Sequence, residues 1–242
     1  MVTVYRYRIR LLDPLFYARE GLGAAYTPPY LHATALNMAV KSALNLDPAG
    51  QPYIVSDENG GRNIPRYDCS LVSRDFYFTP GRLASALHYR PEVTKGETDG
   101  YVVSTETKDV AGKVFRAATL NYLAPETVFQ GFLLELKPRA WPDLLRLGTF
   151  RGKARLYLEE ADSVRPVAGE HTASHPVDPL VTAVERGVMV GMFPYPVVDN
   201  ALCRHAVSAR VPGERFPAIV AYPDTWQLPD VATAAGKGPL VI

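Results

Sequence analysis

The stretch that decides the fold is VYRYRIRL, residues 4–11. Every second residue is aromatic or aliphatic: Tyr5, Tyr7, Ile9 and Leu11. The residues between them are Arg6, Arg8 and Arg10. Because successive side chains of a strand point to opposite faces, this pattern predicts a strand with one core face and one row of guanidinium groups. The row is either a solvated strand face or a binding surface.

A second segment repeats this polarity pattern. LGTFRGKARLYLEE, residues 147–160, contains a glycine turn followed by a predicted strand over 153–158. Alternation places one set of its side chains inward (Ala154, Leu156, Leu158) and the other outward (Lys153, Arg155, Tyr157). Two separate strands with the same basic outer row favour a binding surface over a solvated face.

The remaining patterns predict short elements separated by turns. Thr27-Pro28-Pro29 is a helix-start signal, and the residues after it carry an apolar stripe at helical spacing. We expect helices at 30–46, 80–89, 142–147 and 181–186, strands at 68–78 and 129–136, and a hairpin formed by 206–211 and 217–222. A polar insertion at 90–122, with a hairpin turn near Gly112, interrupts this order.

This order of elements predicts an α+β fold. A strand, a helix, two further strands, a helix and the basic strand suit a ferredoxin-like core, in which helices lie on one face of an antiparallel sheet. We expect a single domain over 1–242, with the insertion projecting at about 90–122 and a flexible tail at about 230–242. Four cations lie in the insertion: Lys95, Lys108, Lys113 and Arg116.

Composition excludes several classes of protein. The formal net charge is +1, so no global excess of cations indicates a nucleic-acid binder. No apolar run has the length of a membrane helix, and the N-terminus has charges where an export signal needs its apolar core. Cys69 and Cys203 have no partner at metal or redox spacing, so free thiols and a cytoplasmic location are expected.

Charge is nevertheless concentrated around the glycine turn. Residues 137–155 contain one anion, Asp143, and six cations: Lys137, Arg139, Arg146, Arg151, Lys153 and Arg155. Gly148 and Gly152 would let a phosphate approach backbone N–H groups, because no Cβ stands in the way. Lysine and arginine supply the attraction for a polyanion. The alternative is an ordinary β-turn beside a basic edge strand.

Catalytic motifs are weak in this chain. It has no G-x-S-x-G elbow, no P-loop and no dinucleotide-binding glycine motif. His171 and His175 have a metal-like spacing but lack further ligands nearby, so no metal or cofactor is expected. His32, close to Tyr26, Tyr30 and Lys41, could support metal-free RNA cleavage. A histidine at a helix start is more often a capping or core group.

A family resemblance adds to these patterns. VYRYRIRLLDPLFYAREGLGAAYTPPYLHATALNMAV, residues 4–40, is similar to the N-terminal region of the small RNA-capping subunit of the type I-D CRISPR interference complex. LGTFRGKARL, residues 147–156, resembles the glycine-rich turn of the same family and of the superfamily of repeat-associated RNA-binding proteins. The two matches cover roughly a fifth of the chain and fall in the expected order.

The resemblance implies an RRM-type, ferredoxin-like core with a long thumb insertion. It implies that the protein holds the 5′ handle of a CRISPR RNA beside a large subunit and a repeated backbone subunit, and it leaves open a contact with target DNA near its recognition motif. Carried over by position, the handle-contacting candidates are Arg19, His32, Gly148, Arg151, Lys153 and Arg155. The row Arg6, Arg8 and Arg10 comes from periodicity alone.

Three functions are therefore compared. The first is a non-catalytic, RNA-binding subunit of an antiviral ribonucleoprotein, since another subunit of this group cuts the precursor RNA. The second is a metal-independent endoribonuclease that processes CRISPR repeat RNA, with His32 as acid or base. The third is a scaffold whose basic faces contact only acidic partner subunits.

Overall fold

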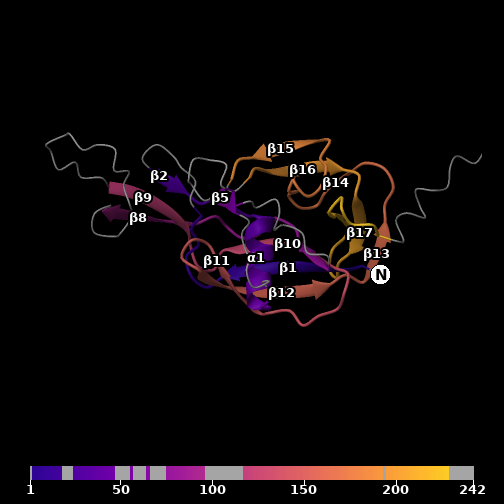
Figure 1. Ribbon diagram of the computed structural model, residues 1–242, viewed down its shortest axis with the longest axis horizontal. Coiled ribbons are helices and arrows are strands. Elements are labelled where there is room, and N and C mark those ends of the chain that lie inside the picture. Colours follow the sequence, from indigo (N-terminus) through magenta and orange to yellow (C-terminus); the bar gives the residue numbers. More distant parts are fainter. Residues whose placement is uncertain are drawn as a thin grey trace, which may run out of the picture.

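A seven-stranded antiparallel sheet forms the centre of the fold (Figure 1). The computed structural model describes residues 2–17, 24–46, 55–56, 64–65, 75–95, 117–192 and 195–228. The strands follow the order β11-β12-β1-β10-β7-β3, and β6 also pairs with β10. Their bounds are β1 Thr3–Leu11, β3 Tyr30–Leu31, β6 Phe76–Phe78, β7 Gly81–Leu83, β10 Val128–Glu135, β11 Leu144–Leu147 and β12 Gly152–Glu160.

The two basic strands of the sequence are neighbours in this sheet. β1 and β12 pair in antiparallel register, so that Arg10 faces Arg155 and Arg8 faces Tyr157. On its other side β1 pairs with β10, where Arg8 faces Gln130. Residues directly opposite one another share a face of the sheet. The predicted outward rows of the two strands therefore form one surface, called here the outer face.

Helix α1, Ala33–Ala43, covers the opposite, inner face of the sheet. Tyr7, Ile9 and Leu11 of β1 pack there with buried side chains of the helix. Asn37 fastens the helix to the sheet: its amide donates to the carbonyl of Phe78 at 2.9 Å and accepts from the Phe78 N–H at 3.0 Å. One polar side chain thus satisfies two backbone groups at the point where helix and strand meet.

The helix begins later than predicted. Its N-cap is His32, whose Nδ1 accepts a hydrogen bond from the Thr34 N–H at 3.1 Å. Tyr30 and Leu31 form β3 and pair with β7 instead. Thr27 does not cap the helix, because its hydroxyl bonds the backbone of Leu15 and Tyr17. The predicted helix at 30–46 therefore contains a strand and a shorter helix.

The other predicted helices were wrong. Residues 80–89 contain β7 and the start of β8, residues 144–147 form β11, and residues 181–185 are turns leading to β15. β11 alternates exposed and buried residues against β12, which is the pattern of a half-buried edge strand. At 80–89 and at 144–147, pairing with a neighbouring strand outweighed a short helix signal. The predicted strands at 129–136 and 153–158 are confirmed as β10 and β12.

Two small antiparallel sheets follow β12. The first has the order β13-β17-β18, with β13 Ser163–Pro166, β17 Ala206–Arg210 and β18 Ala218–Ala221. The second has the order β14-β16-β15, with β14 His171–Thr172, β15 Arg186–Val190 and β16 Val197–Cys203. The pairing of β17 with β18 confirms the hairpin predicted around Pro212-Gly213. Val207, Ala209 and Val220 of the first sheet pack on the outer face of the main sheet.

A separate hairpin lies at the opposite end of the molecule from β13 and β17 (Figure 1). β8, Tyr89–Lys95, pairs antiparallel with β9, Ala117–Leu123, and β2, Ala24–Tyr26, joins β9 in parallel. The short strands β4, Val55–Ser56, and β5, Ile64–Pro65, pair with each other. The segments 96–116 and 229–242, where the insertion tip, its turn near Gly112 and the tail were predicted, lie outside the described residues.

The observed class is therefore a mainly β fold with an antiparallel sheet and, among the described residues, one α-helix on one face. The ferredoxin-like arrangement, the single-domain division and the thumb stay predictions. Within the described part of the chain, no helix has the length and apolarity needed to cross a membrane.

Candidate nucleic-acid interface

The outer face of the main sheet is divided into two halves. Near the start of β1, Val4, Phe132, Leu134 and Tyr77 are buried under the C-terminal strands. We call this the covered half. Near the end of β1, side chains of four neighbouring strands are left uncovered, and this is the open half: Arg8, Arg10, Gln130, Arg146, Lys153, Arg155 and Tyr157.

Five of the predicted contact residues meet on the open half. Arg10 lies opposite Arg155, and Arg146 lies opposite Lys153, so the cations occupy adjacent positions on three strands. Arg8, Lys153 and Arg155 are exposed and make no ion pair with any described residue. Arg10 is paired with Glu126, which is itself exposed. Exposed cations held in one plane by a sheet attract a polyanion laid across them.

Arg6 does not belong to this surface, although the alternation placed it in the same row. It is only 7% exposed and forms ion pairs with Glu159 and with Glu214. Its Nε donates to Glu159 Oε2 at 3.1 Å. Burying an arginine is costly unless its charge and its donors are matched, and the two carboxylates do this here. The predicted row of three exposed guanidinium groups is corrected to two.

Close packing explains why both positions of the turn are glycine. Gly148 has φ +76°, and a Cβ there would lie 2.7 Å from Leu15 Cδ1 and 2.8 Å from the Phe16 carbonyl. A Cβ on Gly152 would lie 3.0 Å from the Pro14 carbonyl. Both glycines let the turn press against the segment that follows β1.

Several N–H groups of the turn are already used within the protein. The Thr149 N–H donates to the Phe16 carbonyl at 2.9 Å, and the Lys153 N–H donates to Asp13 Oδ2 at 2.9 Å. Arg151 N–H donates back to the Gly148 carbonyl at 3.1 Å. The prediction that the turn offers these N–H groups to a phosphate is therefore corrected. The turn and the strands beside it instead present the charges of Arg146, Arg151 and Lys153.

Tyr157 is a candidate contact that the sequence analysis did not select. Tyr157 is 48% exposed in the open half, directly opposite Arg8. An exposed aromatic ring on a sheet, surrounded by arginines, is a surface on which an unpaired base can stack. The signal was present in the sequence, because alternation already placed Tyr157 outward beside Arg155.

His32 lies inside the protein and not at a surface. Its side chain is buried, its Nδ1 accepts from the helix, and the nearest carboxylate oxygen, Oδ2 of the buried Asp178, is 3.9 Å from Nδ1. Burial lowers the pKa of His32 to about 4. Tyr30, one of its suggested partners, donates its hydroxyl to Asp199 instead. The ring is a neutral N-cap at physiological pH, which is the role expected of a histidine at a helix start.

Other predicted residues lie at or beyond the edge of the described structure. Lys95 is the last residue of β8 and pairs with Ala117. Four candidates lie outside the described residues: Arg19, Lys108, Lys113 and Arg116.

The histidine pair noted in the sequence has other partners. His171 Nε2 lies 3.0 Å from the Ala168 carbonyl, and the buried His175 accepts from the Ala221 N–H at 3.0 Å. Among the described residues no group of three His, Cys, Asp or Glu side chains could hold a metal ion. Cys203 is buried, and burial raises the pKa of its thiol to about 11.

Comparisons with known proteins give a family. The family model described as type I-D CRISPR-associated protein Cas5/Csc1 matches residues 2–229. A solved structure titled "Cryo-EM structure of the Type III-B Cmr-beta bound to cognate target RNA and AMPPnP, state 1" contains a similar chain, with 10% sequence identity and a TM-score of 0.42. That similarity covers 82% of this chain and 86% of the other. No curated protein matches.

Proposed function

The chain belongs to the family of type I-D CRISPR-associated Cas5/Csc1 proteins, which are subunits of CRISPR effector complexes, and on this premise we propose that it holds the 5′ handle of the CRISPR RNA. The observation that carries this proposal is the open half of the outer face, where two strands far apart in sequence bring exposed cations together. The RRM-type, ferredoxin-like core that the resemblance implies is part of the same proposal.

The open half suits a single strand of RNA in three respects. It extends over four neighbouring strands, and so it can contact several consecutive nucleotides. Its free cations, Arg8, Lys153 and Arg155, can each neutralise one phosphate. Tyr157 stands among them and can stack on a base, a contact that a scaffold for acidic proteins would not need.

The proposed contact set changes accordingly. Arg6 and His32 leave it, because both are buried within the protein. Tyr157 enters it. Gly148 and Gly152 leave it as direct contacts, because their role is the close packing of the turn. The remaining members of the set are Arg8, Arg10, Arg146, Arg151, Lys153 and Arg155, together with Arg19 and the hairpin cations Lys95, Lys108, Lys113 and Arg116. In this proposal the hairpin of β8 and β9 acts as a thumb that clamps the guide, and the protein links the large and backbone subunits.

We also propose that the subunit does not cut RNA. A general acid or base must reach the substrate within hydrogen-bond distance, and His32 is 1% exposed. A His32→Ala complex should therefore carry RNA of unchanged length and unchanged ends. RNA whose processing depends on His32 would instead support the ribonuclease alternative.

The test of RNA binding is its dependence on salt. We expect the purified full chain to bind a synthetic handle RNA with an affinity that falls as salt rises. Changing Arg8, Lys153 and Arg155 together to alanine should reduce the slope of log affinity against log salt by roughly 2, at about 0.7 per lost phosphate contact on a single strand. At 0.1 M salt the same relation predicts a loss of roughly 100-fold in affinity.

Three other exposed arginines provide a matched control. Arg165, Arg186 and Arg210 lie on the C-terminal strands, away from the open half, and changing all three to alanine removes the same three positive charges. The control should keep more of the affinity and of the slope than the open-half variant. Equal losses in the two variants would mean that RNA responds to total charge and not to this surface. A chain that binds no RNA but still joins its complex would support the scaffold alternative.

A further inference from the structure

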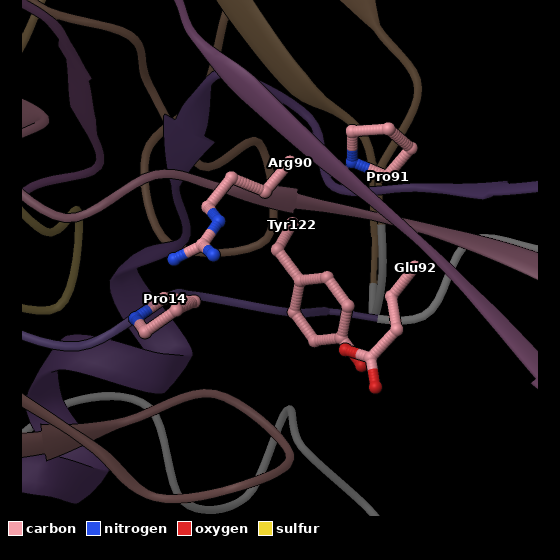
Figure 2. A pocket seen from close by; sticks show the side chains of 5 residues that line it. All are labelled: Pro14, Arg90, Pro91, Glu92 and Tyr122. Carbon is pink, nitrogen blue, oxygen red and sulfur yellow. The ribbon is translucent and has the colours of Figure 1, made fainter.

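A hollow of about 290 Å³ lies where the hairpin of β8 and β9 meets the segment after β1. It is lined by Pro14, Arg90, Pro91, Glu92 and Tyr122 (Figure 2). Arg90 lies opposite Tyr122 in the hairpin register, and Glu92 lies opposite Leu120. These four side chains therefore share one face of the hairpin, and Pro14 comes from a different part of the chain.

Tyr122, which lines the hollow, belongs to an aromatic cluster. Phe16, Leu120 and Tyr122 form a small buried cluster, and the rings of Phe16 and Tyr122 lie 5.2 Å apart. Phe150, from the tip of the glycine turn, adds a third ring, 5.9 Å from Phe16 and 6.0 Å from Tyr122. Phe150 is 47% exposed, so the aromatic surface continues from the hollow towards the solvent.

This cluster explains why the turn must press so closely on the segment after β1. The Thr149 N–H bonds the Phe16 carbonyl, and the missing Cβ of Gly148 leaves room for Leu15 and Phe16. Together these contacts fix Phe150 against Phe16. The structural role of the glycine turn is therefore to hold this aromatic cluster in place, and not to bind phosphate through its backbone N–H groups.

The charges of the hollow select a base over a phosphate. Arg90 and Glu92 are exposed, and neither makes an ion pair with a described residue. A carboxylate repels a phosphate, but it accepts strong hydrogen bonds from the amino group of a base. Arginine can donate to the ring nitrogens or carbonyl oxygens on the same edge.

The hollow also borders the open half. Asp13, next to Pro14, accepts a hydrogen bond from the Lys153 N–H, and the Pro14 carbonyl lies against Gly152 at the start of β12. A strand of RNA that crosses Lys153 and Arg155 therefore passes directly beside the hollow. A base turned out of such a strand has a site within reach.

We infer that the hollow of Pro14, Arg90, Glu92 and Tyr122 receives one unstacked base of the bound RNA and prefers a base with an exocyclic amino group. The base lies against Pro14 and the ring of Tyr122, and Glu92 accepts from its amino group while Arg90 donates to its acceptors. This inference rests on the proposed function, because it needs an RNA strand on the open half.

An abasic scan tests the inference. Handle RNAs are made with one nucleotide at a time lacking its base, and their affinities for the full chain are compared. We expect one position at which removing the base weakens binding about 5- to 100-fold, the range measured for one base on an aromatic site. Arg90→Ala should weaken binding of the intact RNA and should make that position much less sensitive to base removal.

Glu92→Gln tests whether Glu92 selects a base that carries an amino group. Uracil has no exocyclic amino group and presents a carbonyl oxygen where cytosine carries its amino group, and Glu92 repels that oxygen. The wild-type chain should therefore bind uracil at the sensitive position more weakly than the amino-bearing bases. Glutamine can turn its own amide to donate to that oxygen, so the preference should shrink several-fold.

The outcomes separate this inference from the proposed function. Arg165→Ala, on β13, is the control for Arg90→Ala and should keep the sensitive position unchanged. The inference is overturned if no position is sensitive, or if Arg90→Ala and Glu92→Gln leave the sensitive position and its base preference unchanged. In either case, RNA binding that still depends on Arg8, Lys153 and Arg155 leaves the proposed function standing. If it does not depend on them, both proposals fail.

Discussion

The covered half and the open half of the outer face are built from the same strands but have opposite properties. On β1, Arg6 and Arg8 occupy successive outward positions. Arg6 is enclosed by Glu159 and Glu214, whereas Arg8 lies opposite Tyr157 and Gln130 and is exposed. The difference arises from Glu214 and the C-terminal strands, which reach over one half of the face and not over the other.

This contrast separates stability from binding. The covered half contributes apolar burial, since Val4, Phe132 and Leu134 pack against residues of β17 and β18. The open half buries little apolar surface but carries exposed cations. Substitutions in the covered half should therefore change the free energy of unfolding, and substitutions in the open half should change affinity for RNA. The predictions below test this separation, starting with the largest expected effect.

Leu134→Ala should produce the largest loss of stability. Leu134 is fully buried in the covered half, and removing three carbons there should lower the free energy of unfolding by about 2–5 kcal/mol. Gln130→Ala, four residues earlier on the outer face of β10, should cost less than about 0.5–1 kcal/mol. Urea denaturation of both variants measures this. Equal losses would show that the open half also carries part of the core.

Gly148→Ala should have the next largest effect. Its φ of +76° is unfavourable for alanine, and the new Cβ would meet Leu15 and the Phe16 carbonyl, so we expect a loss of about 2–4 kcal/mol. Gly213 has a similar φ of +74° but no atom within 4 Å of the new Cβ. Gly213→Ala should therefore cost only about 1 kcal/mol. The difference between their thermal unfolding midpoints isolates the close packing under the glycine turn.

Acid should lower the free energy of unfolding without changing the charge of the open half. Burial lowers the pKa of both His32 and His175 from 6.5 to about 4. The unfolded chain then binds more protons than the folded chain between these values, so stability is lost as the pH falls from about 6.5 towards 4. At pH 5 this amounts to about 2 kcal/mol for each histidine relative to pH 7.5. The cations of the open half are arginine and lysine and do not titrate in this range.

Asp178 acts in the opposite direction and provides the control. Burial raises its pKa to about 6, so the folded chain gains stability as the pH falls through this value. The gain at pH 5 is about 1 kcal/mol. Asp178→Asn removes it and should make the loss of stability between pH 7.5 and pH 5 steeper by that amount. Chemical denaturation at the two pH values measures both changes, and a flat profile for the wild-type chain would contradict the assignment.

Arg6→Met and Arg8→Met compare the two halves most directly and should have the smallest effects. Arg6→Met removes both ion pairs of a buried guanidinium and should lower the free energy of unfolding by about 1–2 kcal/mol while leaving the salt slope of RNA binding unchanged. Arg8→Met should leave stability unchanged and lower the salt slope by about 0.7. The free energy of unfolding and the salt slope of RNA binding are measured for both variants. A lower salt slope in Arg6→Met would place Arg6 at the RNA surface and contradict the comparison.

Much of the main sheet could be predicted from local sequence. The alternation of residues 4–11 and 153–158 and the apolar run of 129–136 identified β1, β12 and β10 within one or two residues at most of their ends. Alternation also placed Lys153, Arg155 and Tyr157 together on one face. These features depend on the two-residue period of a strand, which a sequence displays directly.

The short elements could not be predicted in this way. Residues 144–147 form a strand because β12 pairs with them, and Tyr30 and Leu31 leave the predicted helix because β7 pairs with them. The partner of each segment lies elsewhere in the chain, and proline and helix propensity carry no information about it. The aromatic cluster under the glycine turn is similar, since it joins Phe16, Tyr122 and Phe150 from three separate segments.

The sequence by itself therefore determined the strand faces, the basic rows and the position of the glycine turn. The tertiary structure alone decided which members of those rows stay free. Arg6 and Arg8 are indistinguishable by periodicity, and the carboxylate that helps to neutralise Arg6 belongs to Glu214, 208 residues away. The alternation of a strand fixes only the side to which a side chain points. What covers that side depends on segments brought there by folding, and this coverage leaves Arg8 exposed while Arg6 is buried.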